Sequence, residues 1–185
     1  MRAIRFLPFL LLIGCASVQT TPAPGALSKT PASIQSWSME GRIGVQSTDG
    51  AWQANLYWEH DPIQDRLRIS GPLSQGLVSI VVQKDLIYVN EGNGVTALSH
   101  DPDAMLRQRL GFAIPLASLR YWMLGVSDPG KASAPMKTGG FRQLDWQISP
   151  DRFTVVAGWT LPQKLRVQGL GVKLKILADT WNIKG

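Results

Sequence analysis

A two-residue alternation of apolar and polar side chains recurs in short segments along most of the chain, and it restricts the fold strongly. Between residues 52 and 58 the even positions are Trp, Ala, Leu and Trp, and Gln53 and Asn55 lie between them. Leu67 and Ile69 alternate with arginines in the same way. This period is that of a β-strand with one face in solvent and the other face in a core.

Further short apolar segments follow, and glycine, asparagine, aspartate or proline separates nearly every one of them from the next. They occupy residues 77–82, 86–89, 95–98, 141–148, 153–156, 165–167 and 172–176. Strands this short, in series and joined by tight turns, predict an antiparallel sheet that curls into a barrel or half-barrel.

Two segments in the middle of the chain depart from this period and predict short helices. The first opens at Asp101 and Pro102, an N-cap candidate followed by a proline in the first turn, and it extends to Gly111. The second starts at Pro115, ends near Gly125, and has an apolar stripe of Leu116, Leu119, Trp122 and Met123. Because a curved sheet and an amphipathic helix each have one apolar side to bury, we expect the helices to cover the concave face.

The N-terminus has the organisation of a bacterial export signal. Arg2 and Arg5 precede an apolar run at residues 6–14. This run is shorter than the roughly 20 residues of a membrane span, and it fits the core of a signal peptide, which has about 7 to 15 residues. Residues 12–15, Leu-Ile-Gly-Cys, read as a lipobox, in which the cysteine becomes the new, lipidated N-terminus.

These features predict three parts of the chain. Residues 1–14 are a signal peptide that is cleaved off. Residues 15–33 are the lipidated cysteine, with an N-acyl diacylglycerol lipid bound covalently to Cys15, and a flexible tether rich in Thr, Pro, Ala and Ser. Residues 34–185 are one folded domain. The alternative, an ordinary secreted protein with a free thiol, is disfavoured because a lone cysteine is a liability in an oxidising compartment.

The two residues after the cysteine are Ala16 and Ser17. In bacterial lipoproteins, which this N-terminus resembles, an aspartate directly after the lipidated cysteine tends to hold the protein at the inner membrane. The absence of that aspartate predicts a lipid-anchored protein on the periplasmic face of the outer membrane.

Charge and side-chain chemistry argue against several functions. Loss of Arg2 and Arg5 lowers the 19 basic side chains to 17 against 13 acidic ones, and the formal net charge from +6 to +4. This mild positive balance suits work beside anionic surfaces or acidic partners, but without a basic block or a known motif it does not indicate nucleic-acid binding. The chain has two histidines and no serine in a nucleophile elbow, and it lacks metal ligands at usable spacing. We therefore predict no enzyme activity, no metal site and no cofactor beyond the lipid on Cys15.

Three longer motifs follow the lipobox and the tether. They are SGPLSQG at residues 70–76, IPLASLRYWMLG at residues 114–125 and KLKILADTWNI at residues 173–183. In this order, and over essentially the whole chain, they resemble the LolB family of outer-membrane lipoprotein receptors. The resemblance implies a mainly β protein with two or three short helices: an antiparallel, unclosed (half) β-barrel with a helical lid over a hydrophobic cavity.

The function that the resemblance implies is transfer of lipoproteins. The protein would accept acylated lipoprotein cargo from a periplasmic carrier of the LolA type and insert it into the inner leaflet of the outer membrane, in contact with phospholipid and as a monomer. Two alternatives stay open. A structural lipoprotein could anchor a complex without transferring lipid, and a soluble LolA-type carrier could share the fold, although a carrier must leave the membrane and would not keep a lipobox.

Bulky apolar side chains on the inward faces are the candidates to line the cavity. Each of them could equally be a plain core residue. They are Trp52, Leu56, Trp58, Leu67 and Ile69 from the strands, and Leu116, Leu119 and Met123 from the second helix.

The turn at Pro72 and Leu73 has a leucine where a turn between strands normally presents polar residues. By itself this leucine could fold back on a neighbour or be one of the exposed apolar residues that proteins tolerate. In LolB-like proteins a protruding loop carries an exposed leucine that delivers cargo into the membrane, and Pro72 and Leu73 match that pair. The resemblance therefore implies a membrane-insertion loop here, although Ser74 replaces the glycine expected next.

Overall fold

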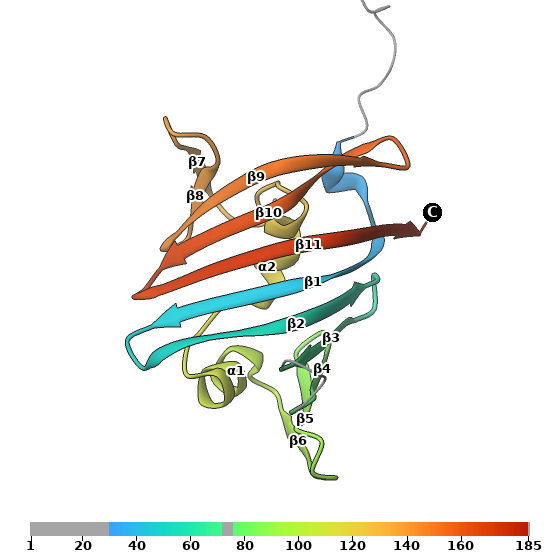
Figure 1. Cartoon of the computed structure of the whole chain (residues 1–185), viewed down its shortest axis with the longest axis vertical. Helices are drawn as coiled ribbons and strands as arrows, with labels where there is room; N and C mark the ends of the chain where they lie inside the picture. The colour runs from blue at the N-terminus through green and yellow to red at the C-terminus, as the bar shows by residue number, and fades with distance from the viewer. Residues whose placement is uncertain (1–29, 72–75, 185) are drawn as a thin grey trace, which may run out of the picture.

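Eleven strands form one antiparallel sheet in the order β6-β5-β4-β3-β2-β1-β11-β10-β9-β8-β7 (Figure 1). The computed structural model describes residues 30–71 and 76–184, so the predicted signal peptide, Cys15, Pro72 and Leu73 lie outside the described residues. The strands are β1 (Ser36–Ser47), β2 (Gly50–His60), β3 (Asp65–Ser70), β4 (Val78–Gln83), β5 (Leu86–Asn90), β6 (Thr96–Ser99), β7 (Ser133–Pro135), β8 (Phe141–Gln143), β9 (Trp146–Val156), β10 (Trp159–Gly169) and β11 (Val172–Lys184).

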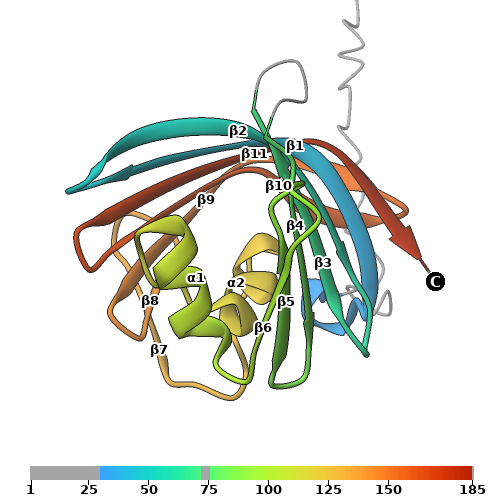
Figure 2. The same ribbon diagram turned by 90° about the horizontal axis from the view of Figure 1, so that it is seen from below.

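The sheet curls without closing. Its two edge strands, β6 and β7, do not pair with each other in the part of the chain that the structure describes. Seen from below in Figure 2, the sheet bends around two helices that lie inside the curve. The predicted antiparallel, unclosed half-barrel with helices on its concave side is therefore confirmed.

The first and last strands of the fold lie side by side at the centre of the sheet. β1 pairs with β2 on one side and with β11 on the other. The pairing between β1 and β11 is interrupted by a register shift between Glu40 and Gly41, where Asp179 of β11 is the additional residue. Such a bulge increases the local twist of the two strands.

The helices are α1 (Pro102–Leu110), α2 (Leu116–Met123) and a 3₁₀ turn, η1 (Pro31–Ser33). Asp101 caps α1 as predicted, since its carboxylate accepts a hydrogen bond from the backbone N–H of Ala104 at 2.9 Å. Gly111 ends α1 with φ of 81°, in the left-handed region that favours glycine. The predicted apolar stripe of α2 is buried.

One predicted strand is divided in the structure. Residues 141–148 form β8 and the start of β9, because a turn at Leu144, with φ of 53°, reverses the chain between them. The predicted strand at residues 153–156 is the far end of β9 and not a separate element. The turn carries a leucine in place of the glycine or asparagine that usually marks a positive φ, and the sequence therefore gives no sign of it.

Tryptophans occupy the core at one end of the sheet. The ring centroid of Trp37 lies 5.2 Å from that of Trp58 and 5.3 Å from that of Trp181. All three rings are buried, so β1, β2 and β11 share one aromatic cluster on the concave side. Among the described residues, the helices are too short to cross a bilayer.

Candidate functional site

An apolar cavity lies between the concave face of the sheet and the two helices. Its volume is about 40 Å³, and every residue that lines it has an aliphatic or aromatic side chain. The sheet supplies Ile43, Trp52, Leu56, Trp58, Leu67, Ile69, Ile80, Leu174 and Ile176, and the helical segment supplies Leu106, Leu110, Phe112, Ile114, Leu116 and Leu119.

Seven of the eight residues named from the sequence line this cavity. They are Trp52, Leu56, Trp58, Leu67, Ile69, Leu116 and Leu119. Met123 is buried but does not line it. At 1.5 Å of rise per residue, Met123 lies about 10 Å further along α2 than Leu116, which takes it past the end of the cavity.

Sequence reasoning missed the contribution of the first helix and of the segment between the helices. Leu106 and Leu110 come from α1, and Phe112 and Ile114 come from the connection to α2. The apolar spacing of Leu106 and Leu110, four residues apart, was a usable signal, because residues at this spacing share one face of a helix.

The cavity is small in this arrangement of the helices. Its volume of about 40 Å³ is far below the roughly 300 to 1,000 Å³ of pockets that hold small molecules. A hydrocarbon chain therefore enters only if a helix moves away from the sheet.

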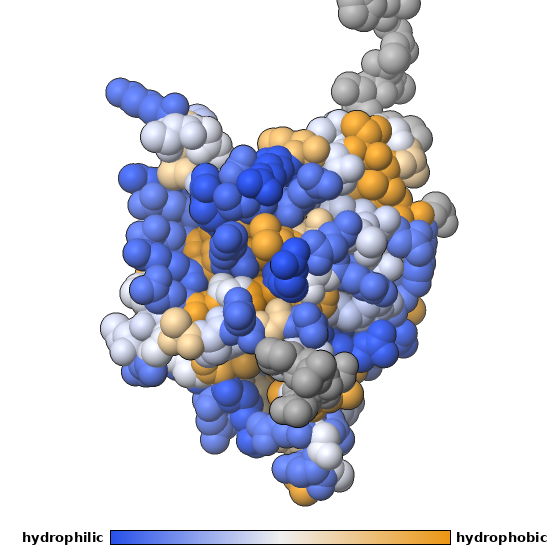
Figure 3. Space-filling view, viewed as in Figure 1, coloured by the Kyte–Doolittle hydropathy of each residue, from blue (hydrophilic) through white to orange (hydrophobic). Residues whose placement is uncertain are grey.

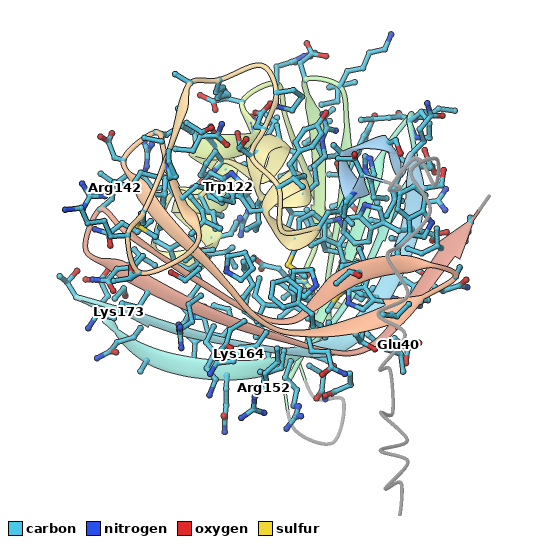
Figure 4. The ribbon with its side chains drawn as sticks, turned by 90° about the horizontal axis from the view of Figure 1, so that it is seen from above. Glu40, Trp122, Arg142, Arg152, Lys164 and Lys173 are labelled. Atoms are coloured by element: carbon cyan, nitrogen blue, oxygen red, sulfur yellow. The ribbon has the colours of Figure 1, made fainter. Side chains whose placement is uncertain are left out.

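Helix α2 is held firmly by a buried hydrogen-bond network. Trp122, which Figure 4 shows inside the curve of the sheet, donates from Nε1 to Gln143 Oε1 at 2.7 Å. The Ser118 hydroxyl donates to a carboxylate oxygen of Asp128 at 2.7 Å. Gln143 Nε2 donates to the carbonyls of Asp128 and Lys131, each at 2.9 Å, and Gln143 Oε1 also accepts from the Asp128 backbone N–H. This network links α2 to β8 and to the loop that precedes β7.

Replacing Gln143 with alanine should lower the free energy of unfolding by about 2 to 4 kcal/mol, because it leaves buried partners of the amide unpaired. Urea denaturation followed by tryptophan fluorescence measures this change. Gln147→Ala is the matched control, since Gln147 is exposed on β9 and should change the stability little. Equal midpoints for the two variants would show that the network does not stabilise α2.

A second polar cluster holds α2 beside the cavity. Asp65 of β3 is buried, and its Oδ1 accepts a hydrogen bond from Trp58 Nε1 at 2.9 Å. His60 Nδ1 lies 2.9 Å from the same oxygen. Arg120 of α2 forms an ion pair with the other carboxylate oxygen at 3.6 Å. Since Trp58 also lines the cavity, this cluster fixes the orientation of one of its walls.

Helix α1 is attached less firmly. Of its nine residues, Met105 and Leu106 are buried, whereas five of the eight residues of α2 are. Its ion pair, from Arg109 to Glu91 at 2.9 Å, is partly exposed and contributes little to stability. Helix α1 is therefore the element whose displacement would enlarge the cavity at the lowest cost. We call it the lid.

The described residues contain no group of three histidine, cysteine, aspartate or glutamate side chains placed to hold a metal ion. The site as described has three parts: the apolar cavity, the firmly held helix α2 and the weakly attached helix α1.

Comparison with known proteins places the chain in a family. The family model "Outer membrane lipoprotein LolB" matches residues 35–181. The chain belongs to the LolB family. An outer-membrane lipoprotein LolB of Marinomonas sp. (strain MWYL1) is 28% identical over 193 aligned positions, which cover 99% of this chain and 98% of the relative. The LolB of Thiobacillus denitrificans is 28% identical over 178 positions, covering 91% and 90%.

Among solved structures, a crystal structure of a LolA superfamily protein from Nitrosomonas europaea is similar with a TM-score of 0.49 and 10% sequence identity, covering 83% of this chain and 88% of that one. The LolB family model begins at residue 35, just before β1, and ends at Trp181 in β11. It therefore includes all the residues that line the cavity.

Proposed function

We propose that this protein is an outer-membrane lipoprotein receptor that accepts acylated lipoproteins from a LolA-type periplasmic carrier and inserts them into the inner leaflet of the outer membrane. The observation that carries the proposal is the cavity beneath the helices, whose lining is entirely apolar. Membership of the LolB family supports it. So do the names of the relatives, which are outer-membrane lipoproteins.

Transfer of this kind needs affinity and no chemical step. Each acyl methylene that leaves water contributes about 0.8 kcal/mol, so the acyl chains of a lipoprotein need an apolar environment at every stage. A cavity that holds them somewhat better than the carrier does, and less well than a bilayer, moves the cargo downhill without nucleotide hydrolysis.

Entry of the acyl chains requires the lid to move. The sheet and α2 are fixed relative to each other by the Gln143 and Asp65 clusters, whereas α1 lacks a comparable buried network among the described residues. Outward movement of α1 lifts Leu106 and Leu110 away from the sheet, and the cargo's hydrocarbon lies between these leucines and the sheet. The apolar surface that α1 leaves is thus covered again by the acyl chains.

The N-terminal segment supplies the anchor in this proposal. A lipid on Cys15 and a tether over residues 15–33 hold the folded domain close to the periplasmic face of the outer membrane. A protein fixed at the destination membrane, in monomeric form, can receive cargo from a diffusing carrier and pass it on over a short distance.

The competing function is that of a structural lipoprotein that anchors a complex. It differs in one measurable respect, because such an anchor needs no vacant apolar site. Native mass spectrometry without detergent, after incubation with an acylated peptide, separates the two. A receptor retains the peptide at a ratio of one to one, and an anchor does not.

A variant at the lid tests the cavity directly. Leu110→Glu should slow transfer of an acylated peptide from the carrier to the vesicle-anchored protein about tenfold, because the loss of one apolar contact of about 1.5 to 3 kcal/mol corresponds to at least a factor of ten. Leu110 is half-buried at the end of α1, so the fold should tolerate the change. Gln108→Glu places the same charge on the exposed side of α1 and should transfer at the normal rate. If Leu110→Glu and Gln108→Glu transferred the acylated peptide at equal rates, the cavity would not take part in transfer.

A further inference from the structure

The convex face of the sheet, on the side away from the helices, carries a group of basic side chains. Arg42 of β1, Arg166 of β10, and Lys173 and Lys175 of β11 are outward-facing and exposed. Figure 4 shows Lys164, Lys173 and Arg152 on this side, pointing away from the helices. We call the surface formed by Arg42, Arg166, Lys173 and Lys175 the basic face.

The pairing of the strands brings these cations together. Lys175 lies opposite Gly44 on one neighbouring strand and opposite Arg166 on the other. Lys173 lies two residues away on β11, on the same face, and Arg42 lies two residues from Gly44 on β1. The four positions therefore occupy adjacent rows of one face, within the reach of long side chains.

A glycine at the centre of the basic face leaves a depression. A Cβ added at Gly44 would have the Lys175 carbonyl oxygen, at 3.9 Å, as its nearest neighbour, so this part of the sheet is open to solvent. Two shallow hollows, of about 510 and 300 Å³, meet at Gly44, Gln53 and Lys175. Their linings include all four cations of the basic face and no carboxylate. Figure 3 shows apolar surface in the hollowed centre of this face, with hydrophilic side chains around it.

Part of the positive charge is not neutralised within the protein. Arg42 pairs with Asp179 at 2.9 Å, and Arg166 shares Asp151 with Lys164. The hydrogen bond from Lys164 lowers the pKa of Asp151, which therefore stays ionised near neutral pH. Within residues 30–71 and 76–184, Lys173 and Lys175 have no carboxylate within ion-pair distance. The basic face can thus attract an external anion.

The connection between β3 and β4 starts and ends on the same side of the sheet. Ser70 and Leu77, which flank it, line a further hollow together with Tyr57, Arg68 and Asp179 of the convex face. Leu77 is 43% exposed although it is apolar. Ser70 and Leu77, the described residues on either side of positions 72–75, therefore both lie on the convex side.

We infer that the basic face is the surface that this protein presents to an anionic phospholipid bilayer, with lipid phosphates seated in the hollows beside Gly44, between Lys173, Lys175 and Arg166. The inference rests on the proposed anchoring of the protein at a membrane. Charge complementarity supports it: each lysine or arginine near an anionic leaflet strengthens association about fivefold. An apolar floor with a cationic rim also suits a phosphate group and the glycerol region below it. With this face toward the bilayer, the concave side and the lid are free to receive the carrier.

Amine footprinting tests the orientation on the intact lipidated protein. The protein is anchored in vesicles of phosphatidylcholine, or of phosphatidylcholine with phosphatidylglycerol, and treated with an acetylating reagent, and the rate at each lysine is read by mass spectrometry. On the anionic vesicles we expect the acetylation rates of Lys173 and Lys175 to fall to about one fifth of their values on phosphatidylcholine, or lower. Lys137, exposed in the turn between β7 and β8, should react equally fast on both. Salt at about 1 M, where the Debye length is about 3 Å, should abolish the difference.

Two variants with the same loss of charge provide the control. The double variant Lys173→Gln, Arg166→Gln should raise the acetylation rate of Lys175 on the anionic vesicles toward the rate measured on phosphatidylcholine alone. Lys137→Gln with Arg142→Gln, at the edge of the sheet, should leave it unchanged.

Equal rates at Lys173 and Lys175 on the two kinds of vesicle would overturn the inference. So would protection that arises on phosphatidylcholine when a LolA-type carrier is added, because the basic face would then be a protein-docking site. Transfer of cargo is measured in the same preparation. Normal transfer without protection contradicts the orientation alone, and protection without transfer contradicts the proposed function alone.

Discussion

Gly41→Ala should lower the free energy of unfolding by about 4 kcal/mol or more, which is at the extreme of single substitutions. An added Cβ at Gly41 would lie 1.9 Å from the carbonyl oxygen of Leu177 and 2.9 Å from its carbonyl carbon. Both are backbone atoms of β11, so no change of rotamer relieves the clash. The strands must separate at the bulge in the centre of the sheet. Chemical denaturation monitored by circular dichroism measures the change.

Gly44→Ala is the matched control on the same strand. A Cβ there would lie 3.9 Å from the Lys175 carbonyl oxygen, an ordinary contact. Since alanine restricts the unfolded chain more than glycine does, this variant should be as stable as the parent or more stable by about 0.5 to 1 kcal/mol. If Gly41→Ala and Gly44→Ala unfold at the same denaturant concentration, the close approach of β1 and β11 is not a constraint on the fold.

Leu73→Glu should leave cargo uptake intact and reduce delivery from the protein to the membrane about a hundredfold or more. The estimate combines the loss of a leucine that enters lipid, about 1.5 to 3 kcal/mol, with the cost of bringing a carboxylate toward the bilayer. The measurement has two parts: capture of acylated peptide from the carrier, and appearance of that peptide in acceptor vesicles.

Val95→Glu is the control for the change at Leu73. Val95 is 68% exposed in the connection between β5 and β6 and is part of neither the cavity nor the basic face. It receives the same negative charge, and delivery should be unaffected. If Leu73→Glu delivered the acylated peptide to acceptor vesicles at the normal rate, the prediction that residues 72 and 73 form an insertion loop would be wrong.

The sequence predicts the faces of most strands because a half-buried sheet imposes a strict period of two. Along β2, Leu56 and Trp58 point to the concave side, whereas Gln53 and Asn55 point to solvent. This period also explains why the strand residues named for the cavity all line it. Whether such residues enclose a space or fill it depends on the distance between sheet and helices, which no local pattern encodes.

The strand β1 escaped prediction because its pattern is irregular. Trp37, Ser38 and Met39 are buried in succession, and Gly41 and Gly44 carry no side chain to mark a face. The irregularity has a structural cause, since the aromatic cluster takes up one end of the strand and the bulge resets its register. Both depend on β11, more than 120 residues further along the chain.

The polar clusters beside the cavity could not be predicted either. Gln143 and Asp65 occur in strand segments where a polar residue normally points to solvent, yet both are buried. They are stable inside because Trp122, Asp128, Trp58 and other distant groups satisfy them. Such partners are brought together by the tertiary fold, so the sequence around either residue does not reveal them.

The pairing of β1 with β11 has a consequence for how the chain becomes structured. Strand β1 is synthesised early but cannot pair on both sides until β11 (Val172–Lys184) has been synthesised, because β11 joins the two halves of the sheet. Contacts between such distant segments slow folding, since the long intervening loop must close before they form. A growing polypeptide therefore cannot complete its central β-sheet until residues 172–184 have been made.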